Sequence, residues 1–153
     1  MALRNRMVVS AMGTNFGEEG GFVGERIIRY HERQARGGAA LIVLGVTGVG
    51  WPHGANMPRQ IAISDDKYID GLMALTGAVH QHGAKIAAQL HHGGLVATED
   101  GREGRPVWVP SFPAPIEGNF SEAFLDSELA AMFDNAAARV NPQTLAIAAF
   151  TMA

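Results

Sequence analysis

The sequence contains no cysteine among its 153 residues, so disulfides, thiolate catalysis and iron–sulfur ligation by this chain are excluded. Charge is also sparse. Charged residues make up 18% of the chain, the formal net charge is −3, and Lys and Arg do not gather into long clusters. A basic surface for nucleic acid is therefore not indicated, and no nucleic-acid partner is expected.

Long hydrophobic runs are missing as well. The apolar stretch that follows residues 1–6 is too short for a signal peptide or a membrane span. We therefore expect a soluble, cytoplasmic protein with no membrane partner. Hydrophobic residues nevertheless make up 47% of the chain, enough for a packed core, and the length is that of one domain.

Apolar runs alternate with amphipathic segments along the chain. We expect strands at 7–11, 39–45 and 85–90, and helices at 25–36, 66–82 and 127–140. Ser64 is the expected N-cap of the second helix. This order predicts an α/β fold with a parallel sheet, right-handed crossovers and a buried first strand. Periodicity leaves the tail at 144–153 open between a fourth strand and a short helix.

Residues 85–94 organise the chain, because an apolar strand there ends in polar and small residues. Ligands of parallel α/β folds bind at the carboxyl ends of the strands. The amide of Gln89 offers a donor and an acceptor, which suits the edge of a flat heterocycle such as a flavin or a nucleobase. The alternative is a glutamine that only satisfies neighbouring backbone groups.

Histidines and tryptophans offer weaker signals. His91 and His92 are adjacent on a strand and point to opposite faces, so no metal site is predicted. His80 and His82 lie at a helix end and are expected to be solvated. Residues 45–64 form a long connection, which suggests a functional loop. Trp51 in this loop, like Trp108 further on, either caps a substrate or covers exposed core.

Four separated blocks of the sequence resemble the Old Yellow Enzyme family, also called the NADH:flavin oxidoreductase family. They are residues 5–14, 30–43, 75–90, and a fourth block formed by 109–111 and the helix after Asp126. The branch that contains 2,4-dienoyl-CoA reductases is the most similar. The resemblance covers about residues 5 to 140. It divides the chain into an N-terminal portion of an FMN-binding TIM barrel at 1–140 and a divergent tail at 141–153.

The resemblance implies a partial TIM (β/α)8 barrel that holds its first three βα units. It also implies FMN at the carboxyl ends of the strands, NAD(P)H as reductant and a small-molecule activated alkene as substrate. By position, the family's cofactor-binding residues match Ala11, Met12, Gly13, Val46 and Gln89. Because all five lie late in or just after a strand, we predict that they converge at one end of the sheet.

The chain also departs from the family pattern. Ala11 stands where the family usually has Pro or Ser, and Val46 stands where it has a small residue, so its side chain could crowd the flavin. Leu95 replaces a frequent Arg. The substrate-binding His pair and the Tyr proton donor have no match, so no catalytic residue is assigned.

Two functions follow from this reading. The first is an FMN-dependent NAD(P)H oxidoreductase of ene-reductase type, represented by its N-terminal part. The second is a truncated, non-catalytic remnant that acts at most as a weak flavin-binding module or self-associates through open sheet edges.

Overall fold

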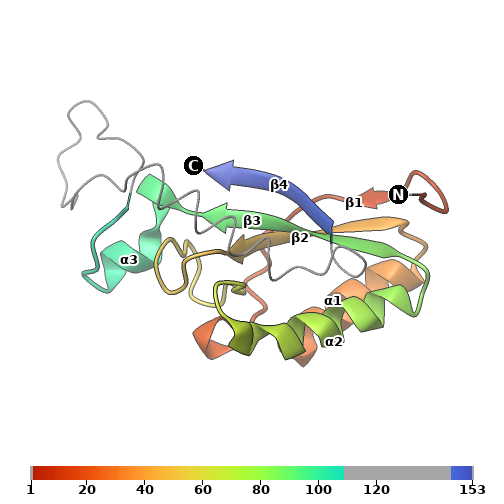
Figure 1. The fold of residues 1–153 in the computed structure, drawn as a ribbon, viewed down its shortest axis with the longest axis horizontal. Coiled ribbons are helices and arrows are strands. Elements are labelled where there is room, and N and C mark those ends of the chain that lie inside the picture. Colours follow the sequence, from red (N-terminus) through yellow and green to blue (C-terminus); the bar gives the residue numbers. More distant parts are fainter. Residues whose placement is uncertain (1, 109–145, 153) are drawn as a thin grey trace.

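A computed structural model describes residues 2–108 and 146–152, the latter as backbone only. Its centre is a parallel sheet in the order β1 (Val8–Val9), β2 (Leu41–Gly48), β3 (Lys85–His92) and β4 (Ala146–Met152) (Figure 1). The parallel pairing of the expected strands is confirmed. The tail, which periodicity left open, forms a strand beside β3.

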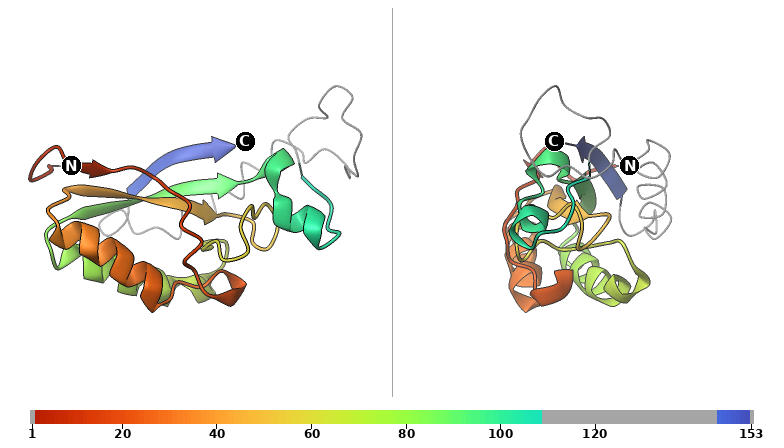
Figure 2. Two further views of the ribbon diagram at one scale, coloured as in Figure 1. Left: turned by 180° about the vertical axis from the view of Figure 1, so that it is seen from behind. Right: turned by 90° about the vertical axis from the view of Figure 1, so that its left-hand side faces the viewer.

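Two long helices, α1 (Glu25–Arg36) and α2 (Ile69–His80), lie on the same side of the sheet (Figure 2). Short helical turns occur at Glu19–Gly21, Asp66–Tyr68 and Gly94–Val96, and the short helix α3 (Thr98–Arg102) follows β3. The first helix has the bounds that the sequence predicts. The expected helix at 127–140 lies outside the described residues.

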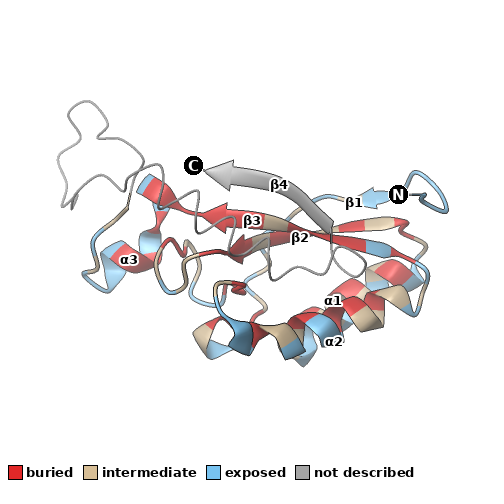
Figure 3. Ribbon diagram, in the orientation of Figure 1, coloured by how far each residue is buried: buried red, intermediate tan, exposed pale blue. Residues whose placement is uncertain are grey.

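The core fills the space between the sheet and the two helices, where buried strand residues face buried helix residues (Figure 3). Alternate residues of β2 and β3 supply one side of it, and α1 and α2 supply the other. Members from the strands and α2 include Ile42, Leu44, Ile86, Ala88, Leu90, Leu72, Leu75 and Val79. Each fully buried aliphatic side chain of this kind stabilises the fold by roughly 1.5–3 kcal/mol. This core fixes the register of β2 against β3.

The expectation that the first strand is buried is wrong. Val8 is 52% exposed and the preceding Met7 equally so. β1 is an edge strand that pairs only with β2 among the described strands, through Val8 with Leu41 and Val9 with Ile42. An apolar run identifies a strand but does not show whether a second neighbour covers it.

Two histidines form contacts that the sequence did not predict. His31 of α1 is buried, and its Nδ1 lies 2.9 Å from Gln34 Oε1; burial lowers its pKa. His82 is not simply solvated, because its Nε2 lies 3.1 Å from Glu32 Oε1 on α1. The contact of His31 lies within α1, whereas that of His82 joins two segments distant in sequence, which periodicity alone does not reveal.

The turn that leads into α2 is capped by Asp65 rather than by Ser64. The backbone of Asp65 is extended and its side chain accepts a hydrogen bond from Lys67 N at 3.0 Å. We expect Asp65→Ala to lower the free energy of unfolding by about 1 kcal/mol, the usual effect of removing a cap. Ser64→Ala is the matched control and should change it little; urea unfolding of both variants measures the difference. Equal losses would contradict this cap assignment.

No helix among the described residues is long and apolar enough to cross a membrane.

Candidate functional site

The candidate residues lie at the carboxyl ends of three neighbouring strands. Ala11, Met12 and Gly13 follow β1, Val46 lies near the end of β2, and Gln89 lies in the second half of β3. Because β1, β2 and β3 run parallel, the carboxyl ends of these strands lie at the same end of the sheet (Figure 1). We refer to this group, Ala11, Met12, Gly13, Val46 and Gln89, as the rim.

Gly45 lets the segment after β1 cross close over β2. A Cβ atom on Gly45 would lie 2.2 Å from the Met12 carbonyl oxygen and 2.5 Å from the Met12 nitrogen. Backbone atoms cannot move aside as a flexible side chain can, so only glycine fits here. The absence of a side chain at Gly45 thus places Met12 against the end of β2.

Val46 occupies an unusual backbone conformation. Its φ is +38°, in the left-handed region that β-branched residues rarely adopt, and the register between β2 and β3 shifts between Leu44 and Thr47. This irregularity directs the Val46 N–H to Gln89 Oε1, at 3.2 Å. An N–H group can only donate, so the contact defines which end of the Gln89 amide is the oxygen.

Gly13 lies between two side chains from other segments. The position of a Cβ on Gly13 would be 3.2 Å from Val46 Cγ2 and 2.6 Å from Met57 Cε. One methyl group of Val46 is therefore turned toward Gly13. Met57 comes from the loop after β2 and is a residue that the sequence analysis missed.

The loops that carry Gly13 and Met57 are tied together by backbone contacts. Asn15 Oδ1 accepts a hydrogen bond from Arg59 N at 2.8 Å, and Gly17 N donates to Arg59 O at 3.0 Å. The Arg59 guanidinium also lies 3.7 Å from the Glu18 carboxylate. These ties hold the turn that carries Met57 against the segment that follows β1.

The rim residues are thus brought together by direct contacts. Met12 packs on Gly45, Val46 packs toward Gly13 and bonds to Gln89, and Ala11 directly precedes Met12. Met12 itself is 57% exposed. The arrangement offers one amide group, two glycine surfaces and apolar side chains, which suits the edge and face of a planar ring.

A second polar cluster lies beyond the end of β3 and centres on Asp100. This carboxylate is fully buried and accepts hydrogen bonds from Gly54 N and Arg105 Nε, both at 2.7 Å. His53 Nδ1 lies 3.7 Å from Asp100 Oδ1, and the His53 ring stacks on Trp108 with centroids 4.1 Å apart. Trp108 therefore packs onto this loop cluster.

His92 belongs to the same cluster and is held neutral. It is 3% exposed, and its Nδ1 accepts a hydrogen bond from Gly94 N at 3.2 Å, which leaves the ring proton on Nε2. Burial lowers the pKa of His92 to about 4, with the nearby charge of Asp100 opposing this and His91 and His53 adding to it. A neutral His92 packed under Gly54 is a structural element of the loop.

His91 is buried as well, and its Nδ1 lies 3.4 Å from Gln60 Nε2. Burial lowers its pKa too. Within the part of the chain that the structure describes, no three His, Cys, Asp or Glu side chains are grouped to hold a metal ion.

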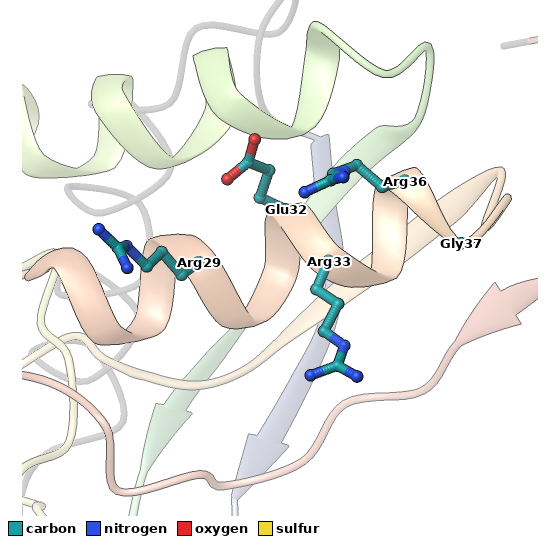
Figure 4. Close-up of a pocket in the computed structure, with 5 residues that line it drawn as sticks. All are labelled: Arg29, Glu32, Arg33, Arg36 and Gly37. Carbon is teal, nitrogen blue, oxygen red and sulfur yellow. The ribbon is translucent and has the colours of Figure 1, made fainter.

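An open pocket lies on α1, away from the rim. It is lined by Arg29, Glu32, Arg33, Arg36 and Gly37 (Figure 4). Two of its charges already have partners, because Arg29 pairs with Glu25 at 2.5 Å and Glu32 with His82. None of the rim residues lines it.

Comparison with known proteins gives the family. The family model described as "NADH:flavin oxidoreductase / NADH oxidase family" matches residues 1–139. The chain belongs to this family. An NADH oxidase of Thermoanaerobacter brockii is 41% identical over 120 residues, which cover 78% of this chain and 18% of that protein. An NADPH dehydrogenase of Halalkalibacterium halodurans is 35% identical over 112 residues, which cover 72% and 32%.

The fold agrees with this family. The crystal structure of Old Yellow Enzyme from a Pichia species superposes with a TM-score of 0.79 at 20% identity, covering 98% of this chain and 42% of that one. The sheet and helices described above are therefore part of a TIM barrel. The chain spans between about a fifth and a third of the length of these curated relatives.

Proposed function

We propose that the rim is the flavin-edge part of an FMN site, in an NAD(P)H oxidoreductase of ene-reductase type that reduces activated C=C bonds. The single observation that supports this most is the Gln89 amide, which the Val46 N–H holds at the carboxyl end of β3. Besides this oxygen, the Gln89 amide carries N–H donors, and we propose that these donors serve the ligand. A flavin pyrimidine edge carries carbonyl acceptors for them.

The glycines at the rim support the same assignment. Gly45 lets the Met12 backbone lie against the end of β2, and Gly13 lies against a methyl group of Val46, the residue whose N–H bonds to Gln89. When bound, FMN supplies hydride transfer between NAD(P)H and a small-molecule alkene. The chain's own residues bind one edge of the ring; we assign no catalytic residue. We further propose that residues 1–140 form the FMN-binding portion and 141–153 a divergent tail.

A second candidate is a non-catalytic module that binds flavin weakly or self-associates. The exposed apolar edge at Met7, Val8 and Met12 favours it, because unpaired edge strands associate with other chains. The two candidates differ in flavin affinity. A micromolar site needs about 8 kcal/mol, whereas a neutral hydrogen bond such as that of Gln89 contributes only about 0.5–1.5 kcal/mol.

FMN titration of the purified chain tests the proposal. We expect binding weaker than about micromolar, and we expect Gln89→Glu to weaken it about tenfold, because a carboxylate keeps an acceptor for Val46 but replaces the donor by a negative charge. Gln81→Glu, at the exposed end of α2, is the matched control and should leave the affinity unchanged.

Equal affinities of wild type and Gln89→Glu would show that Gln89 does not contact the flavin. Submicromolar binding accompanied by turnover of NAD(P)H and an activated alkene would exclude the non-catalytic candidate.

A further inference from the structure

Met57 lies beside the rim and comes from the long loop at 45–64. The length of this loop suggested a function, but the sequence did not place Met57 itself at the rim. Its Sδ and Cε lie 3.1 Å and 2.6 Å from the position of a Cβ on Gly13, and Val46 Cγ2 lies 3.2 Å from the same point. The Met57 thioether and a methyl group of Val46 therefore lie next to each other, beside the Cα of Gly13. Val46 in turn bonds to Gln89, so the contacts form one continuous surface.

The backbone of Met57 is held in place from both sides. Gln60 N donates to Met57 O at 3.2 Å, Asn56 N donates to Gln60 Oε1 at 3.1 Å, and Thr98 Oγ1 donates to Asn56 O at 3.0 Å. Gln60 is buried. The turn that carries the Met57 side chain is thus fixed.

A methionine on a fixed turn suits contact with a planar ring. Its thioether is polarizable, adapts to irregular surfaces and packs favourably against aromatic systems. Met57 is only partly buried, so a ligand can reach it. Met12, which directly precedes Gly13, is exposed as well.

We propose that Met57 is a ring-contacting residue of the flavin site, and that its thioether packs against the isoalloxazine ring whose edge Gln89 binds. The inference rests on the proposed function, because it needs a flavin at the rim. It adds a contact from the loop after β2, which lies beyond the strand ends that the sequence singles out. The ring, rather than the phosphate, is the part of the ligand that Met57 contacts.

Protection from oxidation measures this contact in the unmodified protein. The chain is treated with dilute peroxide in the dark, because illuminated flavin itself oxidises thioethers, and sulfoxide at each methionine is followed by mass spectrometry. FMN is added up to about 1 mM, enough to half-fill a site of only about 4 kcal/mol. Met73 is the internal control, since it is 63% exposed on α2, away from the rim.

We expect FMN to slow oxidation of Met57 and Met12 and to leave Met73 unchanged. Riboflavin, which has the ring without the phosphate, should protect Met57 as well, whereas inorganic phosphate should not. Protection of Met12 without Met57 would overturn the inference and leave the flavin site standing. Protection of neither would overturn both, and equal protection of Met73 would show that flavin coats the chain unspecifically and overturn the inference.

Variants give a second, independent measurement. Met57→Ala should raise the Kd for FMN about fivefold, and Met57→Leu, which keeps the volume of the side chain, should raise it less than about twofold. Met73→Ala is the matched control and should not change it. Unchanged affinity in Met57→Ala with normal urea unfolding would contradict the contact.

Discussion

Gly45→Ala is expected to lower the free energy of unfolding by about 3 kcal/mol and to abolish measurable FMN binding. The new methyl group would meet three backbone atoms of Met12 at 2.2–2.5 Å. Overpacking of a core by one methyl group destabilises by roughly 1–3 kcal/mol when side chains can yield. Here the neighbours are backbone, so we expect the upper end of this range and displacement of the segment after β1. Urea unfolding and FMN titration measure the two effects.

Gly77→Ala is the matched control for this substitution. Gly77 lies within α2, and a Cβ atom there would meet nothing within 4 Å. Since alanine favours helix more than glycine does, this variant should gain about 0.5–1 kcal/mol and bind FMN normally. The same substitution of glycine by alanine is thus expected to lower the free energy of unfolding at position 45 and to raise it at position 77. A neutral Gly45→Ala variant would mean that Met12 does not pack on Gly45.

The second large effect is a loss of stability on mild acidification, caused by His92. Its pKa is about 4 in the folded protein and near 6.5 when the chain is unfolded. Protons therefore bind preferentially to the unfolded state. The contribution of neutral His92 to the free energy of unfolding is complete at pH values above its pKa in the unfolded chain. It is lost as the pH falls toward 4, its pKa in the folded protein. At about pH 5 the loss amounts to roughly 2 kcal/mol.

Urea unfolding at about pH 7.5 and about pH 5 tests this, because most carboxylates remain ionised throughout that interval. His31 and His91, whose pKa values burial also lowers, change stability in the same direction. His92→Gln should therefore flatten the pH dependence without removing it. If wild type and His92→Gln lose equal stability between the two pH values, His92 is not the buried neutral group described here.

The sequence predicted what depends on local pattern. The first helix has its expected bounds, and β2 and β3 are the parallel neighbours that the alternation of apolar runs and helices predicts. The burial of β1 was wrong, because the exposure of Val8 depends on what covers the edge of the sheet. Asp65 and Ser64 are both good caps, and only the backbone conformation distinguishes them.

At the rim, too, some residues could be predicted from the sequence and others depend on the tertiary structure. Gly13 and Val46 could be proposed from the resemblance to the family, and Gln89 also from its place late in an apolar strand. Met57 could not, since its place depends on how residues 54–60 fold back over the segment after β1, through contacts such as that of Asn15 with Arg59 N. The left-handed φ of Val46 was likewise hidden, because valine gives no sequence signal for that conformation.

The parallel sheet also constrains how quickly the chain folds. Its ladders pair Val8 with Leu41, Leu41 with Lys85, and Ala87 with Ala146, so every pair joins residues separated by roughly thirty positions or more. Among the described strands no two are joined by a hairpin turn, so no strand pair can begin to form at a short local turn. Loop closure must precede each pairing, which makes folding slow and leaves the apolar strands uncovered while the chain is still incomplete.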